Sequence, residues 1–181
     1  MGTQTKSYKG EDREVHTVYL CWELTDCPMT GTKGVNHLIG KEFTFSLNVK
    51  SGLRQMIVSW RGGKDFAEDD DFDLHKLFGK PCLVNVGNTD NGEGRTFSNF
   101  KGCTPLPKGM AVKKPQRGNL FWEIEAGALE ELSWLPYSYG NKISDLVQTT
   151  PEWKARRHGG NGQAEDESET AAVGDSSEIP F

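Results

Sequence analysis

Hydrophobic and polar residues alternate along two segments in the first third of the chain. Residues 15–24 read VHTVYLCWEL, in which every even-numbered position from 18 onward is apolar. Residues 41–49 read KEFTFSLNV, in which every odd-numbered position from 43 onward is apolar. A period of two residues is typical of a strand with one buried face, so the sequence predicts a strand in each segment.

The period changes to that of a helix after position 50. In residues 51–60, SGLRQMIVSW, apolar side chains recur at intervals of three and four residues, which favours an amphipathic helix. Ser51 is suited to be its N-cap, and the pair Gly62 and Gly63 is suited to end it.

A shorter helix is predicted over residues 72–78, FDLHKLF, where the apolar side chains can pack on one side. Asp71 and Asp73 stand at its start, where a carboxylate can cap free amide groups and interact with the helix dipole. Gly79 follows as a C-cap residue.

The next two predicted strands form a hairpin. They are residues 80–88, KPCLVNVGN, and residues 95–103, RTFSNFKGC, and Asn91-Gly92 between them is a strong hairpin signal. A loop rich in Pro, Gly and Lys follows, and the sequence LFWEIE predicts a last short strand over residues 120–125.

Helical segments are expected from Ala126 to Arg157, broken at Pro136 and Pro151, and the composition after Gly159 is that of a disordered tail. This order of elements predicts a mainly β fold with α: an OB-fold-like antiparallel barrel with an inserted helix, because the OB fold is the commonest small barrel of this kind. The predicted organisation is an OB-fold-like barrel over 1–125, a helical appendage packed on the barrel over 126–158, and a disordered acidic tail over 159–181.

Charge is divided unevenly along the chain. There are 26 acidic and 21 basic residues, but six of the acids and none of the lysines or arginines lie after position 158. Residues 1–158 therefore carry a net charge of about +1. A basic body with an acidic tail is typical of nucleic-acid contact or of a regulatory tail. No signal peptide or long apolar run is present, so we expect a soluble cytoplasmic protein without membrane contact.

Few residues are arranged for catalysis. The four cysteines form no CxxC pair and no zinc-ligand spacing with a histidine, and no phosphate-binding loop follows a strand. The run EDDDFD over residues 68–73 can supply carboxylates for a divalent cation, although adjacent carboxylates rarely converge on one ion. The sequence predicts a protein that is not an enzyme and uses no metal or cofactor. A metal-dependent nuclease that uses Asp69 and Asp71 is the less favoured alternative.

A binding site for single-stranded nucleic acid needs exposed flat rings beside positive charge, since bases stack on the rings and cations follow the phosphates. Several aromatic residues lie next to Lys or Arg on predicted strands, although an aromatic side chain with alternating spacing can also fill the core. Phe97 and Phe100 face opposite sides of one strand, so we expect one of them inside and the other outside. The candidate DNA-binding residues are Trp22, Lys41, Lys50, Arg54, Trp60, Arg61, Lys80, Arg95, Phe97, Phe100, Lys101, Lys113, Lys114 and Arg117.

The polar tail ends on two large apolar residues, Ile179 and Phe181. Such a tip can enter a hydrophobic pocket of a partner while the terminal carboxylate and nearby acids pair with cations. The acidic tail can also fold back on a cationic groove and compete with nucleic acid, an effect that salt weakens. The candidate partner-binding tip consists of Asp175, Glu178, Ile179, Pro180 and Phe181.

The last seven residues, DSSEIPF, resemble the C-terminal tip of bacterial single-stranded-DNA-binding proteins, in which an acidic run ends in Ile-Pro-Phe. Here Ser176 and Ser177 replace two acids. The stretches GKEFTFSLNVKSGLRQMIVSWRG, FDLHKLFGKPCLVNV, TFSNFKGCTPLPKGM and ISDLVQTTPEW resemble a family of small proteins from phage and prophage replication and recombination modules. This resemblance implies an OB-fold protein in the cytoplasm of a bacterial host. Relatives generally have a further strand before the stretch matching GTQT, so we expect that strand to be missing, supplied by another subunit or lost to the choice of start site.

We therefore expect non-sequence-specific binding of single-stranded DNA, which protects it during phage replication, recombination or repair, with the tip recruiting proteins of those processes. Dimers or cooperative arrays are compatible with this hypothesis. The alternative is a non-enzymatic adaptor or mimic that occupies host receptors for such tails without binding DNA. A one-sided basic groove with exposed Phe or Trp favours the first hypothesis, and a neutral surface favours the second.

Overall fold

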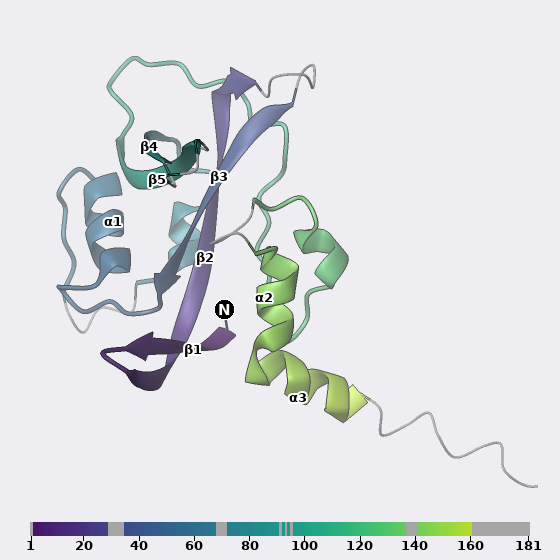
Figure 1. The fold of residues 1–181 in the computed structure, drawn as a ribbon. Coiled ribbons are helices and arrows are strands. Elements are labelled where there is room, and N and C mark those ends of the chain that lie inside the picture. Colours follow the sequence, from purple (N-terminus) through teal and green to yellow (C-terminus); the bar gives the residue numbers. More distant parts are fainter. Residues whose placement is uncertain are drawn as a thin grey trace, which may run out of the picture.

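The computed structural model describes residues 2–28, 35–67, 72–90, 92, 94, 96–136 and 141–160. It is mainly β, with two antiparallel sheets and several short helices (Figure 1). In chain order the elements are β1 (Gly2–Tyr8), β2 (Glu11–Pro28), β3 (Asn36–Thr44), α1 (Gly52–Trp60), the 3-10 helix η1 (Leu74–Leu77), β4 (Cys82–Asp90), β5 (Thr96–Pro105), the 3-10 helix η2 (Leu129–Leu132), α2 (Ile143–Thr149) and α3 (Pro151–Gly160).

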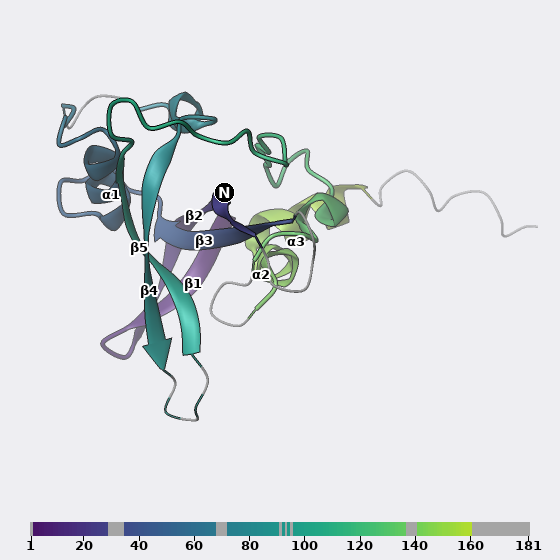
Figure 2. The ribbon, with the colours of Figure 1, turned by 90° about the horizontal axis from the view of Figure 1, so that it is seen from above.

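The long strand β2 lies at the centre of the fold. It pairs with β1 on one edge and β3 on the other, both antiparallel, while β4 and β5 form a separate pair. Helix α1 and the β4–β5 hairpin lie on one side of β2 and β3, and α2 and α3 lie on the other side (Figure 1, Figure 2). Both faces of β2 are therefore covered, whereas the sequence predicted burial on one face.

Residues 2–14 form a strand, a tight turn and the start of β2, none of which the polar sequence predicted. Tyr8 pairs with Glu11 across a two-residue turn, and Lys9 and Gly10 both have positive φ, at 53° and 82°. Two successive positive φ angles are what a type I′ hairpin turn requires. The turn extends β2 back to Glu11, so the predicted start at Val15 is four residues late.

Two other predicted strands differ from the structure. β3 runs over Asn36–Thr44 instead of 41–49. One further bond, from the Phe45 amide to the His16 carbonyl at 2.7 Å, continues its pairing with β2, and the chain then turns, with the Ser51 amide bonded to the Asn48 carbonyl at 2.8 Å. The predicted strand over 120–125 is wrong. This segment ends in a turn at Glu123, whose carbonyl accepts a hydrogen bond from the Gly127 amide at 2.8 Å.

The two sheets are not closed into a barrel, and this part of the predicted fold is wrong for the described residues. β3 and β5 approach each other through side chains, with the Phe43 and Phe100 rings edge to face at 6.3 Å between centroids. No described backbone ladder joins them, so side-chain packing alone connects the two sheets.

The local predictions in the middle of the chain are confirmed. Ser51 Oγ accepts a hydrogen bond from the Arg54 amide at 3.2 Å, and Gly62 and Gly63 end α1 with φ of 71° and 85°. Asp73 caps η1, which is a single 3-10 turn. Strands β4 and β5 pair as predicted, and the helical segments after residue 126 are also present, as η2, α2 and α3.

The main core lies between β2, β3, α1 and β5. Leu53, Ile57 and Cys103 have no exposed surface, and Trp22 stacks on Phe100 at 4.2 Å between ring centroids. A second apolar group, Ile124, Leu132 and Ile143, lies against the other side of the sheet with Thr150. Among the described residues no helix is long and apolar enough to cross a membrane.

The C-terminal helices are tied to the sheet by polar contacts. The Glu152 carboxylate in α3 accepts hydrogen bonds from the Thr3 amide at 3.0 and 3.1 Å and from the Thr3 hydroxyl. Arg156 donates to the carbonyls of Ile124 and Gly127, at 2.9 and 2.7 Å. Helix α3 thus contacts the first strand, while the predicted division of the chain at residue 125 stays a prediction.

Candidate nucleic-acid interface

A groove of about 500 Å³ joins three segments that are distant in sequence: the end of α1 with the residue that follows, the segment 72–81 that contains η1 and leads to β4, and the end of β5 with the residue that follows. It combines three cations with two aromatic rings, and no acidic residue is among the described residues that line it. We call it the basic groove. Its lining consists of Trp60, Arg61, Phe72, Lys76, Leu77, Lys80, Pro81, Pro105 and Leu106.

Arg61 is held in the basic groove by rings. Its guanidinium carbon lies 5.8 Å from the Phe66 ring centroid and 5.5 Å from that of Phe72. Its Nη1 atom is buried and has no hydrogen-bond acceptor among the described residues. A cation held by ring faces keeps its full charge. Arg61 therefore adds positive potential to the groove without a described carboxylate to neutralise it.

A second basic and aromatic surface lies on the β4–β5 hairpin, which projects away from the body (Figure 2). The Phe97 side chain is 52% exposed, and Asn99 shares its face of β5 because alternate residues of a strand point the same way. Gly87 of β4 is the residue paired with Asn99, and the aliphatic part of the Lys101 side chain lies over Gly87. We call Phe97, Asn99 and Lys101 the hairpin surface.

The alternation prediction for β5 is confirmed: Phe97 points outward and Phe100 inward. Phe100 is buried against Trp22, and both side chains belong to the core. They present almost no surface to a ligand, so we remove Trp22 and Phe100 from the candidate DNA-contacting surface.

Arg54 is also removed from that surface. It is 3% exposed, and its guanidinium donates to Asp65 Oδ1 at 3.0 Å, to the Leu47 carbonyl at 2.9 Å and to the Phe66 carbonyl. The sequence suggested Arg54 as one of the cations available to DNA. In the structure the 61–67 segment folds back over α1 and buries it.

The remaining predicted cations are dispersed. Lys41 is half-buried on β3 opposite Leu20, and Lys50 is exposed before α1. Lys113 pairs with Asp26 at 3.1 Å, Lys114 is exposed beside it, and the Arg117 guanidinium lies over Trp134 at 5.3 Å. None of these five lines the basic groove.

Several predicted sites lie outside the described residues. These are Arg95, the whole tip (Asp175, Glu178, Ile179, Pro180 and Phe181), and most of the acidic run, including Asp69 and Asp71. Among the described residues no group of three or more His, Cys, Asp or Glu side chains is placed to hold a metal ion.

Sequence reasoning missed Phe72 and Lys76, both in the basic groove. Phe72 was predicted to pack, and it does stack on Phe66 at 4.9 Å, but it also lines the groove. Lys76 lies within η1 and Lys80 follows its C-cap residue Phe78 by two positions, and their exposed charges are a signal that could have been combined with Arg61.

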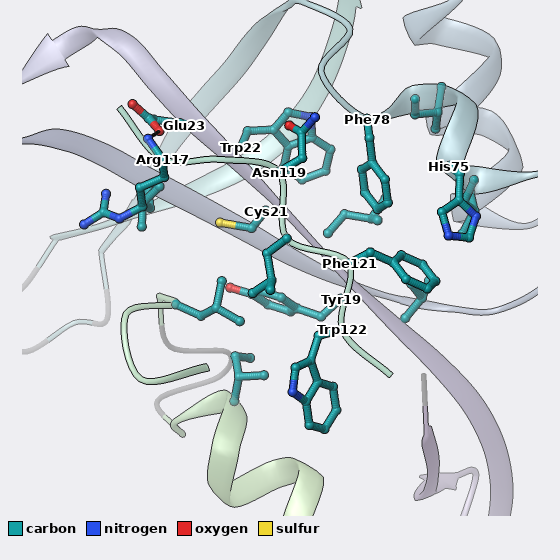
Figure 3. Close-up of a pocket in the computed structure, with 18 of the residues that line it drawn as sticks. Tyr19, Cys21, Trp22, Glu23, His75, Phe78, Arg117, Asn119, Phe121 and Trp122 are labelled. Carbon is teal, nitrogen blue, oxygen red and sulfur yellow. Dashed lines mark hydrogen bonds between the residues drawn. The ribbon is translucent and has the colours of Figure 1, made fainter. Parts of the chain in front are cut away.

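A larger cavity of about 670 Å³ lies beneath the segment 113–124, which we call the strap (Figure 3). The strap crosses one face of β2, where Glu23 Oε1 accepts from the Gln116 amide at 2.7 Å and Glu23 Oε2 from the Arg117 amide at 3.0 Å. Burial alone would raise the pKa of Glu23, but these bonds and the Asn36 side chain outweigh it and lower the pKa.

Three titratable side chains of the cavity lining differ in their pKa. Burial is the main cause that raises the pKa of Cys21 to about 12, although Arg117 opposes it. At neutral pH this thiol is protonated, and the thiolate is the reactive form of cysteine. Tyr19 donates its hydroxyl to the Pro136 carbonyl at 3.0 Å, and burial raises its pKa. Cys82 differs from both, because a hydrogen bond with Cys103 lowers its pKa.

No protein-family model, curated protein or solved structure matches the chain.

Proposed function

We propose that this protein binds single-stranded DNA without sequence preference and protects it during phage replication, recombination or repair. The observation that carries the proposal is the basic groove. Trp60, Arg61 and Lys80 were each expected at a DNA interface from their local sequence, and the fold brings them together with Phe72 and Lys76. Aromatic faces contribute about 1–3 kcal/mol per stacked base, and cations release counterions from the phosphates.

The hairpin surface would provide a second contact. Phe97 is exposed beside Lys101, and a single flat ring with an adjacent cation suits one base and one phosphate. An adaptor that does not bind DNA is expected to have a neutral surface. The basic groove instead carries three cations and no acidic residue among the described residues that line it.

We also propose the finer features that the resemblance implies. The two antiparallel sheets with a helix between them would be an open variant of the OB fold. The acidic tail would compete with DNA for the basic groove, and the tip that ends in Phe181 would recruit replication or recombination proteins in the host cytoplasm.

The main test is a titration of the full chain with a single-stranded thymidine oligonucleotide and with a matched duplex, followed by Trp fluorescence at several salt concentrations. The double variant Lys76→Glu, Lys80→Glu reverses two charges of the groove. We expect it to weaken single-strand binding about tenfold or more at low salt. A plot of the logarithm of the association constant against the logarithm of the salt concentration should become less steep by about 1.4, since each lost phosphate contact contributes about 0.7 for single strands.

The matched control is Lys142→Glu, Lys154→Glu, which makes the same change of charge on the C-terminal helices, where both lysines are exposed. Binding by the control at close to wild-type affinity would assign the effect to the groove. Equal loss in both double variants would mean that only net charge matters. No binding by the wild-type chain at low salt would leave the adaptor hypothesis.

The proposed role of the tail has a separate test. A chain that ends at Gly160 keeps α3 and loses the acidic residues beyond it. We expect tighter single-strand binding at low salt and a difference that vanishes at high salt, because screening removes the competition. Unchanged affinity at low salt would contradict this role.

A further inference from the structure

The cavity beneath the strap and the basic groove share a wall. Trp60, Phe72 and Lys80 line both spaces, together with Leu77 and Pro81. The two spaces therefore adjoin, so a ligand whose charged group lies between the cations of the groove holds its attached flat group next to the cavity.

One end of the cavity is lined by rings. His75 and Phe121 lie 3.9 Å apart between centroids, and Phe78 meets Phe121 at 5.7 Å (Figure 3). Phe121 stands on the strap and is 43% exposed. A ring so exposed beside others offers a face to an entering planar group.

The lining also includes polar side chains. Asn119 and Arg117, both on the strap, line the same space. An amide side chain such as that of Asn119 can both donate and accept hydrogen bonds, so it can pair with the polar edge of any base.

We propose that the cavity beneath the strap accepts one unstacked base of a single strand whose phosphate lies between Arg61, Lys76 and Lys80. This inference rests on the proposed function and specifies where one base of the bound strand would lie. The three cations of the adjoining groove favour a ligand that carries a phosphate over an apolar peptide. The cavity volume of about 670 Å³ lies within the range of about 300–1,000 Å³ that is usual for small-molecule sites.

A bound base would also account for the mixture of aromatic and polar side chains in the cavity lining. The rings near Phe121 would stack on the base, and a carbonyl oxygen or ring nitrogen of the base would accept from the Asn119 side-chain amide. Every natural base has a flat face and at least one acceptor, so the site needs no sequence preference.

The test is photocrosslinking of the full chain to a thymidine oligonucleotide that contains 5-iodouracil, which couples to a neighbouring aromatic ring on irradiation. The crosslinked peptides are then identified by mass spectrometry. We expect crosslinks on the strap at Phe121 or Trp122 and on the segment that holds Phe78. Phe121→Ala should weaken binding about five- to a hundredfold, as expected for one lost stacking contact, and should reduce the crosslink on the Phe78 segment.

The matched control is Met110→Ala, which removes an exposed apolar side chain outside both spaces and should leave both the affinity and the crosslink on the Phe78 segment in place. Oligonucleotide binding with crosslinks confined to the hairpin, residues 96–105, would overturn the base site and leave the proposed function standing. Absence of oligonucleotide binding in the titration would overturn both.

Discussion

The two faces of β2 are held by different forces. Toward α1 and β5, contacts are apolar and close, and Leu53 and Ile57 have no exposed surface. Toward the strap and the C-terminal helices, hydrogen bonds from Tyr19 and to Glu23 and Glu152 make the main links. The cavity of about 670 Å³ reaches into this second side, where Ile143 is part of its lining.

This difference separates stability from binding. Apolar burial stabilises in proportion to area, and a well-packed core cannot open without losing it. Polar ties at the edge of a cavity contribute less each and can open locally. We therefore expect the face toward α1 to determine global stability and the face toward the strap to admit a ligand.

The largest expected effect is on the tightly packed face. Leu53→Ala removes a fully buried side chain and should lower the free energy of unfolding by about 2–5 kcal/mol. Urea unfolding measures it. The control Val112→Ala, at a side chain that is 44% exposed near the start of the strap, should cost less than about 0.5 kcal/mol. A loss below about 1 kcal/mol for Leu53→Ala would contradict the comparison.

The next effect concerns Arg54, which lies in the same core. Arg54→Met keeps the length of the side chain but leaves the carbonyls of Leu47 and Phe66 without their donor. We expect a loss of about 2–3 kcal/mol in the free energy of unfolding and unchanged DNA affinity of the folded protein. If the variant kept the stability of the wild type but bound DNA more weakly, Arg54 would belong to the DNA-contacting surface after all.

A smaller effect is expected where Glu23 holds the strap. Glu23→Gln keeps one carbonyl oxygen, which cannot replace both carboxylate oxygens toward Gln116 and Arg117. The free energy of unfolding should fall by about 1–2 kcal/mol. Hydrogen exchange should speed up at the two strap amides but not in α1, and Glu125→Gln, at an exposed acid just beyond the strap, is the control. Equal exchange in both variants would show that Glu23 does not hold the strap.

The smallest effect is pH-dependent. Hydrogen bonds from Thr3 outweigh the effect of burial and lower the pKa of Glu152 from its ordinary value of 4.5. A lowered carboxyl pKa contributes stability above the unfolded value, and that contribution is lost as the pH falls through the folded value. Glu152→Gln should therefore be less stable by about 1 kcal/mol at pH 7 and equal to wild type once both states are protonated. If the free energies of unfolding of the variant and the wild type differed by the same amount at every pH from 7 to 3, this prediction would be contradicted.

The elements that the sequence alone determined depend on neighbours within a few positions. Ser51 and the Gly62-Gly63 pair bound α1, Asp73 caps η1, and Gly92 ends the β4 side of its hairpin with φ of 77°. These signals act through one hydrogen bond or one φ angle, so they can be recognised in any fold. The Lys9-Gly10 turn belongs to the same class, although its flanking polar residues hid it.

Only the tertiary structure decided which predicted residues share a surface. Alternation showed that Phe97 and Phe100 face opposite ways, but contact with Trp22 selected Phe100 for the core. Arg54 was buried by a segment that folds back from beyond α1.

The basic groove formed because the packing of α1, η1 and β5 brought residues 60–61, 72–81 and 105–106 together. Such contacts between distant segments depend on how whole elements pack, and no local pattern of residues contains that information.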